Sequence, residues 1–223
     1  MTAPKAVTIA VAGAATVSGL WQSRAKAKAC LVLAHGAGAG MTHKTMTAIA
    51  DGLAARGIAT LRYQFPYMER GSKRPDSPAV AHAAVRAAVA EAGRRSLKLP
   101  LFAGGKSFGG RMTSQAQALT PLPGVRGLVF FGFPLHPAGN PSSGRAAHLA
   151  DVSLPLLFLQ GTRDALAEPD FLRPVMAKLG RRATLALFAD ADHSFHVPAT
   201  TGRTDAEVLA EILDTAASWM TSR

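Results

Sequence analysis

Two kinds of apolar pattern follow one another along this chain. Short continuous apolar runs are typical of strands buried on both faces of a sheet, and apolar residues at every third or fourth position are typical of helices. Because the two patterns alternate, they predict an α/β fold with a mostly parallel, eight-stranded sheet and helices on both faces. Strands are expected at residues 7–11, 16–21, 29–34, 58–65, 99–104, 125–133, 154–160 and 183–188. Helices are expected at residues 43–56, 79–95, 108–119, 145–149, 169–179 and 205–220.

The length and composition of the chain agree with this pattern. Its 223 residues, 48% of them apolar, suffice for one sizeable core, so we expect a single domain over residues 1–223. No apolar run reaches the roughly 20 residues that span a bilayer, so we expect no membrane segment. The apolar stretch Ala6–Leu20 follows Lys5 and raises the alternative of a signal peptide. Polar residues at strand-like spacing and the basic turn after it favour an opening hairpin instead.

The net charge and the cysteine content limit the possible binding partners and the cellular compartment of this protein. The chain has 25 Lys and Arg against 14 Asp and Glu, a net charge of +11, which raises the alternatives of nucleic acid or an anionic substrate as a partner. The basic residues are scattered, and no aromatic side chains stand between them as stacking platforms, which argues against nucleic acid. The single cysteine, Cys30, lies in an apolar run and has no internal disulfide partner. We therefore expect a reducing, cytoplasmic location.

The segment Gly105-Lys106-Ser107-Phe108-Gly109 stands between a predicted strand and a predicted helix. A Gly-x-Ser-x-Gly turn in this place is typical of a nucleophile elbow, in which a tight turn lifts the serine hydroxyl above the sheet edge. The glycines are expected where a Cβ would collide with neighbouring chain. A phosphate-binding loop is the alternative, but it would need glycine where Pro100 stands.

A glycine-rich loop, His35–Gly40, follows the strand at residues 29–34. Its backbone folds close to a reacting group, so an N–H of Ala37 or Gly38 is expected to form one half of an oxyanion hole, with the N–H of Phe108 as the other half. We expect His35 and Gly36 to line the substrate site. A dinucleotide-binding loop is the alternative, but it would need glycine where Met41 stands.

Two further strands end in residues that complete a catalytic set. Asp164 follows the strand at residues 154–160, and His193 follows the strand at residues 183–188. Because the carboxyl ends of parallel strands share one edge, Ser107, Asp164 and His193 are expected to meet there as nucleophile, acid and base. Asp164 has the alternative role of a helix cap, and His196 competes with His193 for the role of base. A metal site at Asp190, Asp192, His193 and His196 is a third alternative, which the lack of a ligand cluster elsewhere disfavours, so we expect no metal.

With these residues in place, the chain resembles the alpha/beta-hydrolase fold family over nearly its whole length. Finer matches are Phe65-Pro66-Tyr67, Gly105–Met112, Gly132–Pro137, Gln160–Asp164 and Asp192–Phe195. They resemble a small lidless branch that includes proteins related to dienelactone hydrolases and animal testis-expressed and chromatin-associated relatives. The resemblance implies the roles given above for Ser107, Asp164 and His193. Phe133 stands where that branch leads us to expect tyrosine, so the role of a hydroxyl at that position is absent.

The predicted activity is that of a serine hydrolase acting on an ester or a similar acyl bond, with no cofactor. Only residues 135–153 separate two strands where many such enzymes insert a lid, so we expect an open site for a small soluble substrate. Arg111, Arg145 and Arg163 are expected at its edge, where an arginine binds a carboxylate or phosphate or is an ordinary surface residue. The animal relatives imply an alternative from another class, an interaction module with little or no catalysis. The sequence does not fix the oligomeric state.

Overall fold

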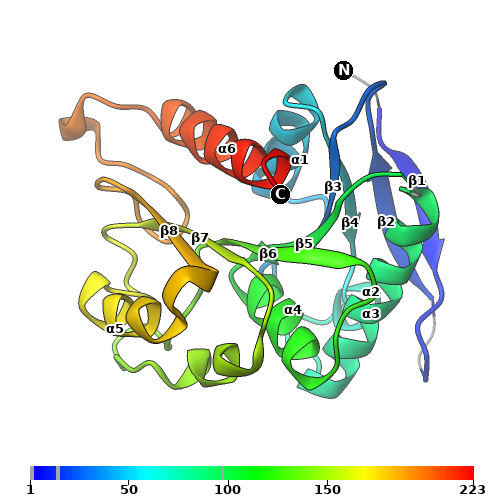
Figure 1. Ribbon diagram of the computed structural model, residues 1–223, viewed down its shortest axis with the longest axis horizontal. Helices are drawn as coiled ribbons and strands as arrows, with labels where there is room; N and C mark the ends of the chain where they lie inside the picture. The colour runs from blue at the N-terminus through cyan, green and yellow to red at the C-terminus, as the bar shows by residue number, and fades with distance from the viewer. Residues whose placement is uncertain (1–2, 14–15, 97) are drawn as a thin grey trace.

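One eight-stranded sheet runs through the whole molecule (Figure 1). The computed structural model describes residues 3–13, 16–96 and 98–223. The strand order is β1-β2-β4-β3-β5-β6-β7-β8. Strand β2 pairs antiparallel with both β1 and β4, and all the other neighbours are parallel. The predicted α/β class, the number of strands and the mostly parallel arrangement are confirmed.

The strands lie close to the predicted apolar runs. Their bounds are β1 (Lys5–Ile9), β2 (Val17–Gln22), β3 (Ala29–Ala34), β4 (Ile58–Tyr63), β5 (Leu101–Lys106), β6 (Val125–Phe131), β7 (Leu156–Gly161) and β8 (Ala183–Phe188). Every residue of β3, β4 and β7 is buried, which explains the continuous apolar sequence of β3 and the mostly apolar sequence of β7, whereas β4 also buries Thr60 and Arg62. The apolar stretch that raised a signal peptide as an alternative supplies β1 and most of β2, and its residues 14 and 15 lie outside the described residues.

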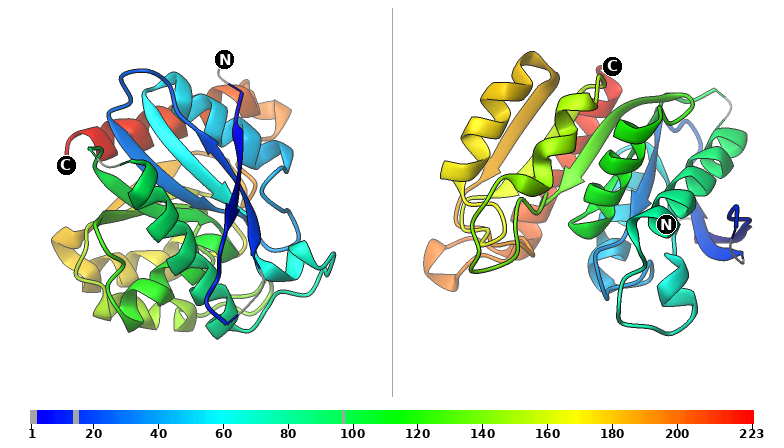
Figure 2. Two further views of the ribbon diagram at one scale, coloured as in Figure 1. Left: turned by 90° about the vertical axis from the view of Figure 1, so that its right-hand side faces the viewer. Right: turned by 90° about the horizontal axis from the view of Figure 1, so that it is seen from below.

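Helices cover both faces of the sheet (Figures 1 and 2). Helices α1 and α6 pack on one face around Leu53 and Ile212, while α3, α4 and α5 pack on the other around Val85, Met112 and Leu172. The helices are α1 (Lys44–Ala55), α2 (Pro66–Glu69), α3 (Pro78–Arg95), α4 (Phe108–Leu119), α5 (Pro169–Leu179) and α6 (Asp205–Thr221), with 3₁₀ turns η1 (Gly144–Asp151), η2 (Gly180–Arg182) and η3 (Ala199–Thr201).

The structure differs from the predicted elements in a few places. The strand expected at residues 99–104 lies at Leu101–Lys106, because Gly104 and Gly105 interrupt the apolar pattern that marks a strand and yet pair normally with both neighbours. The first strand lies two residues earlier than expected, at Lys5–Ile9. Helix α2 was not predicted, because four residues are too few for a helical periodicity. Helix α6 begins with a capping box, in which the side chain of Thr204 accepts from the N–H of Glu207.

The carboxyl ends of the parallel strands form one open edge of the sheet, and no large lid covers it. Residues 132–155, between β6 and β7, contain the eight-residue 3₁₀ turn η1 and otherwise irregular chain. In the described part of the chain, no helix combines the length and the apolar character that a bilayer crossing requires.

Candidate active site

Ser107 occupies the sharp turn between β5 and α4, with φ of 50° and ψ of −117°. This is a strained conformation for a residue with a side chain. A Cβ at Gly105 would lie 2.3 Å from the carbonyl oxygen of Ala34, and one at Gly109 would lie 2.6 Å from the same oxygen. Both glycines are therefore required by close backbone approach, as the sequence pattern predicts.

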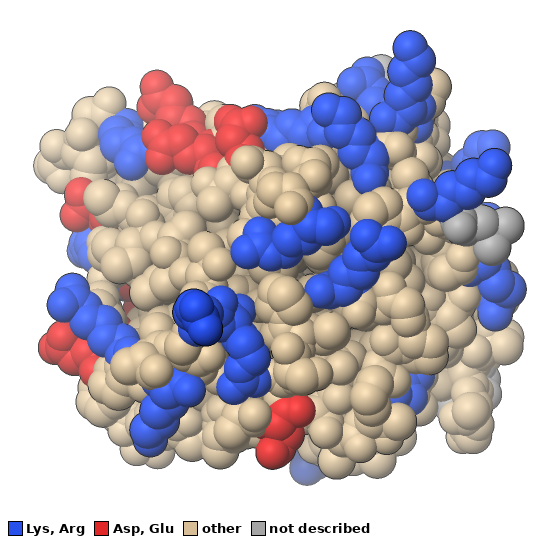
Figure 3. Space-filling model, viewed as in Figure 1, with Lys and Arg blue, Asp and Glu red and all other residues tan. Residues whose placement is uncertain are grey.

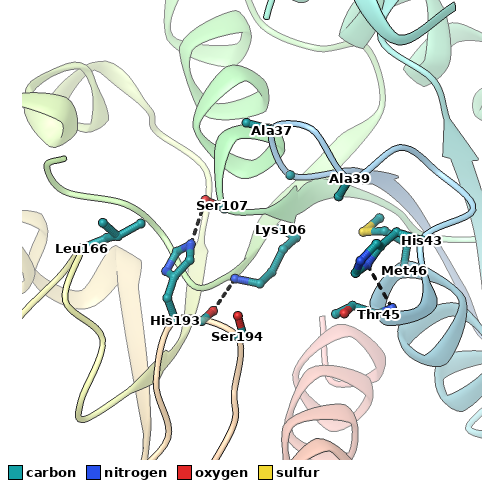
Figure 4. A pocket seen from close by; sticks show the side chains of 11 residues that line it. Ala37, Ala39, His43, Thr45, Met46, Lys106, Ser107, Leu166, His193 and Ser194 are labelled. Carbon is teal, nitrogen blue, oxygen red and sulfur yellow. Dashed lines mark hydrogen bonds between the residues drawn. The ribbon is translucent and has the colours of Figure 1, made fainter. Parts of the chain in front are cut away.

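Ser107, His193 and Asp164 form one hydrogen-bonded chain. The Nε2 atom of His193 lies 2.8 Å from the Oγ atom of Ser107, and its Nδ1 atom lies 2.7 Å from Oδ2 of Asp164. Figure 4 shows the ring of His193 directly beside the hydroxyl of Ser107, with a dashed line between them. The three residues follow β5, β7 and β8, so the parallel topology brings together side chains that are far apart in sequence.

Asp164 is the buried end of this chain, and two further donors hold its carboxylate. It is 1% exposed, and Oδ2 accepts a hydrogen bond of 2.5 Å from the side-chain amide of Gln160. The other oxygen, Oδ1, accepts from the N–H of Leu166 at 2.8 Å. The carbonyl of the Gln160 side chain accepts in turn from the N–H of Phe133. The cap residue of α5 is Glu168, so Asp164 does not have the alternative role of a helix cap.

The loop after β3 is held by two side chains. His35 is fully buried; its Nδ1 atom lies 2.8 Å from the carbonyl oxygen of Gly36, and its Nε2 atom accepts from the N–H of Phe65 at 3.1 Å. Burial lowers the pKa of His35 to about 4, so the ring is neutral and donates from Nδ1. His35 therefore shapes the loop from beneath and does not line the substrate site, contrary to expectation, whereas Gly36 does line it.

The second tether of this loop is Tyr67, whose hydroxyl accepts from the N–H of Gly38 at 3.0 Å. Of the two donors that the sequence left open, Gly38 is thus already engaged. The N–H groups of Ala37 and Phe108 have no acceptor within the described ranges. Both residues line a pocket of about 450 Å³ together with Ser107. The unengaged N–H pair is the arrangement that an oxyanion hole requires.

Lys106, the residue before the serine, extends its side chain into the same region (Figure 4). Its ammonium donates to the backbone carbonyl of His193 at 2.5 Å and lies 5.3 Å from the centre of the Phe195 ring. Burial lowers the pKa of Lys106 to about 8, against the opposing effect of the Asp164 and Asp192 carboxylates. Lys106 therefore ties the loop that carries His193 to the end of β5.

Three of the four side chains in the alternative metal site, those of Asp192, His193 and His196, have other partners. His193 faces Ser107 and Asp164, whereas His196 is exposed and pairs with Asp205 at 3.0 Å. One oxygen of Asp192 accepts from the N–H groups of Ser194 and His196. The structure thus brings His193 to the serine and turns His196 away from it.

Two pockets meet at Ser107. The first has a volume of about 260 Å³ and is lined by Gly36, Lys106, His193 and parts of α1 such as Met46 (Figure 4). The second has a volume of about 450 Å³ and is lined by Ala37, Phe108, Arg111, Arg145 and several prolines. Arg111 and Arg145 thus lie at the site, as expected from the sequence, whereas Arg163 is exposed and lines neither pocket.

A lidless α/β sheet with this serine, histidine and aspartate at its carboxyl edge defines a hydrolase of the α/β fold. The chain belongs to the alpha/beta hydrolase family, since a family model described as an alpha/beta hydrolase domain matches residues 27–221. It is similar to the crystal structure of a dienelactone hydrolase from Anabaena variabilis, with a TM-score of 0.79, 19% identity and 99% coverage of both chains.

Two other solved structures have the same architecture. A serine hydrolase without a lid from Xanthomonas campestris matches with a TM-score of 0.75 and 20% identity, over 99% of this chain and 96% of that one. A protein from Thermus thermophilus matches with a TM-score of 0.70 and 24% identity over the whole of both chains. At these identities the likeness establishes the shared fold alone.

Proposed function

We propose that this protein is a serine hydrolase that cleaves an ester or a similar acyl bond of a small substrate through an acyl-enzyme. The observation that carries the proposal is the continuous chain from Asp164 through His193 to Ser107, with separations of 2.7 and 2.8 Å. Such separations place a base within reach of a nucleophile and a carboxylate within reach of the base.

In the first half of the reaction, Oγ of Ser107 attacks the substrate carbonyl carbon while Nε2 of His193 takes its proton. A bond forms between Oγ and the carbon, and the carbonyl electron pair moves to the oxygen, which the N–H groups of Ala37 and Phe108 stabilise. The tetrahedral intermediate then expels the alcohol, whose oxygen receives the proton from His193. Asp164 holds the ring of His193 in the required tautomer and stabilises its positive charge.

In the second half, His193 removes a proton from water, and the resulting oxygen nucleophile attacks the acyl carbon. The bond between Oγ and carbon breaks, Ser107 recovers its proton from His193, and the carboxylic acid leaves. Every proton that leaves one group is returned to another within the same site, so the cycle uses this chain's residues and water alone.

The dimensions of the site support a small substrate. The two pockets that meet at Ser107 have volumes of about 260 and 450 Å³, and no large lid adds an apolar roof over either of them. A long acyl chain would leave much of its apolar surface in water. Short esters, thioesters and lactones are therefore the proposed substrates.

A fluorophosphonate probe tests the proposal, since it reacts covalently with activated serines. We expect it to label the wild-type protein and not Ser107→Ala, while Ser218→Ala, which changes an exposed serine on α6, remains labelled. A panel of short p-nitrophenyl esters, thioesters and lactones then identifies the bond that is cleaved. A folded wild-type protein that neither reacts with the probe nor cleaves any member of the panel would overturn the proposal in favour of a non-catalytic interaction module.

A further inference from the structure

Two arginines in the second pocket have no counter-charge. Arg111 is half-buried one helical turn after Ser107, and Arg145 lines the same pocket from η1. Neither forms an ion pair within the described part of the chain, and the buried Nε atom of Arg111 has no hydrogen-bond partner there. A buried polar group without a partner is rare in folded proteins and calls for an explanation.

The surroundings of Arg111 make its position costly in the absence of a ligand. Burial lowers its pKa, and the positive charge of Arg145 adds to the same effect. The guanidinium carbon of Arg111 also lies 5.9 Å from the centre of the Phe108 ring, which fixes the group beside the pocket. Two like charges held together in a partly apolar hollow are the arrangement expected where a bound anion supplies the missing negative charge.

The other charged groups near Ser107 already have partners. In the first pocket, the ammonium of Lys106 donates to the carbonyl of His193 and lies near the Asp164 and Asp192 carboxylates. In the second pocket, Asp76 accepts from the N–H of Tyr67 and pairs with Arg70 at 2.6 Å. Arg111 and Arg145 are therefore the charged side chains of this pocket that remain for an anion, and a planar guanidinium matches a carboxylate in bidentate geometry.

The position of His193 decides which part of a substrate enters which pocket. The leaving oxygen must receive its proton from Nε2 of His193, and His193 lines the first pocket and not the second. The leaving group therefore occupies the first pocket. The acyl part extends from Ser107 into the second pocket, where Arg111 and Arg145 stand.

We propose that the acyl part of the substrate ends in a carboxylate that Arg111 and Arg145 bind, so that the enzyme cleaves half-esters of dicarboxylic acids. This inference rests on the proposed serine hydrolase function. The charge of the whole chain acts in the same direction: it is +11, and Lys and Arg are spread over the face shown in Figure 3. A positive field raises the rate at which an anionic substrate arrives, and salt weakens this effect.

Mono-p-nitrophenyl adipate and its methyl ester provide the test, because they differ only in the distal negative charge. Adipate is preferred over succinate, whose aryl half-esters hydrolyse spontaneously by attack of their own carboxylate. We expect wild-type kcat/KM for the charged ester to exceed that for the methyl ester by about tenfold or more, since hydrogen bonds to charged groups are the strong ones. Raising the ionic strength should reduce this preference.

Two variants and a control locate the effect. Arg111→Gln and Arg145→Gln should each lower kcat/KM for the charged ester by about tenfold and change that for the methyl ester by less than about twofold. Arg181→Gln removes an exposed arginine in η2, outside both pockets, and should leave the preference unchanged. Agreement between two variants on different elements guards against misfolding of either one.

The possible results separate this inference from the proposed function. Equal cleavage of the two esters by the wild-type protein overturns the carboxylate inference and leaves the serine hydrolase intact. If neither ester is cleaved and the fluorophosphonate probe does not react, the proposed function fails. The anion site is then tested separately, by measuring the thermal midpoint with and without adipate. A rise in the wild type that is lost in both arginine variants supports the site. The absence of a rise in the wild type overturns it.

Discussion

Removing the hydroxyl of Tyr67 tests whether catalysis depends on the hydrogen bond that holds the loop after β3 in position. Tyr67 is fully buried, and its hydroxyl is the acceptor for the N–H of Gly38 at 3.0 Å. The ring packs near His35, Phe65 and Phe108, with centroid distances of 6.0, 6.4 and 6.4 Å. Tyr67→Phe keeps these contacts and deletes only the tether, so any effect measures the hydrogen bond and not the packing.

The size of the effect follows from the exposure of the loop. Gly38 is exposed, so its N–H finds water when the hydroxyl is lost, and the net loss is that of an ordinary hydrogen bond, about 1 kcal/mol. If that loss loosens the loop that presents the Ala37 N–H, kcat falls by at least about fivefold. The largest decrease in kcat that we expect is that for complete loss of one oxyanion donor, about a hundredfold or more. Because the oxyanion forms only in the transition state, kcat and kcat/KM should fall together.

Tyr63→Phe is the matched control. Tyr63 is also fully buried, and its hydroxyl faces the Thr113 side chain without a hydrogen bond of good geometry to any described residue. Its removal should therefore leave the free energy of unfolding unchanged or raise it, and leave kcat unchanged. Steady-state kinetics on a p-nitrophenyl ester and urea unfolding of both variants supply the measurements. A folded Tyr67→Phe protein with wild-type kcat would refute the reasoning that this tether supports the oxyanion hole.

Three further outcomes follow from the same geometry. Asp164→Asn should lower kcat by about 10⁴-fold, because the amide favours the wrong tautomer of His193, and a loss below about tenfold in ester hydrolysis would contradict that role. Gly109→Ala places a Cβ 2.6 Å from the Ala34 carbonyl oxygen and should lower the thermal midpoint, whereas Gly93→Ala, with nothing within 4 Å of its added Cβ inside α3, should raise it. The pKa of Lys106 is about 8 in the folded protein against 10.5 ordinarily, so between these pH values the unfolded chain binds more protons and stability rises with pH. This rise in the free energy of unfolding is at most about 1.4 kcal/mol per pH unit, and urea titrations of Lys106→Met should lack it. If the free energy of unfolding of the variant rises with pH as steeply as that of the wild type, Lys106 is not the origin of the rise.

The sheet was predictable because its central strands are buried on both faces. Such strands need continuous apolar sequence, and those at Ala29–Ala34 and Leu156–Gly161 lie within one or two residues of the expected bounds. The meeting of Ser107, Asp164 and His193 was predictable for a related reason. A parallel sheet gathers the residues that follow its strands at one edge, whatever their separation in sequence.

The contacts that tune the site were not predictable from the same pattern. Tyr67 reaches Gly38 from a four-residue helix that has no periodic signal, and the Gln160 amide meets Asp164 only because β7 turns sharply at its end. His35 was expected to face substrate, but both of its ring nitrogens find backbone partners and the side chain turns inward. Side-chain direction at a loop depends on which partners the rest of the fold supplies, and local sequence does not carry that information.

Several features of this site lower the stability of the folded protein, and they favour a hydrolase over an interaction module. Ser107 stands at φ of 50°, which costs on the order of 1 kcal/mol or more for a residue with a side chain, and Asp164 is a carboxylate with 1% exposure. The N–H groups of Ala37 and Phe108 have no acceptor among the described residues. A surface that only binds a partner gains nothing from a strained serine aimed at a histidine. In the proposed reaction these features act together beside Oγ of Ser107, where each of them lowers the free energy of a transition state that carries negative charge.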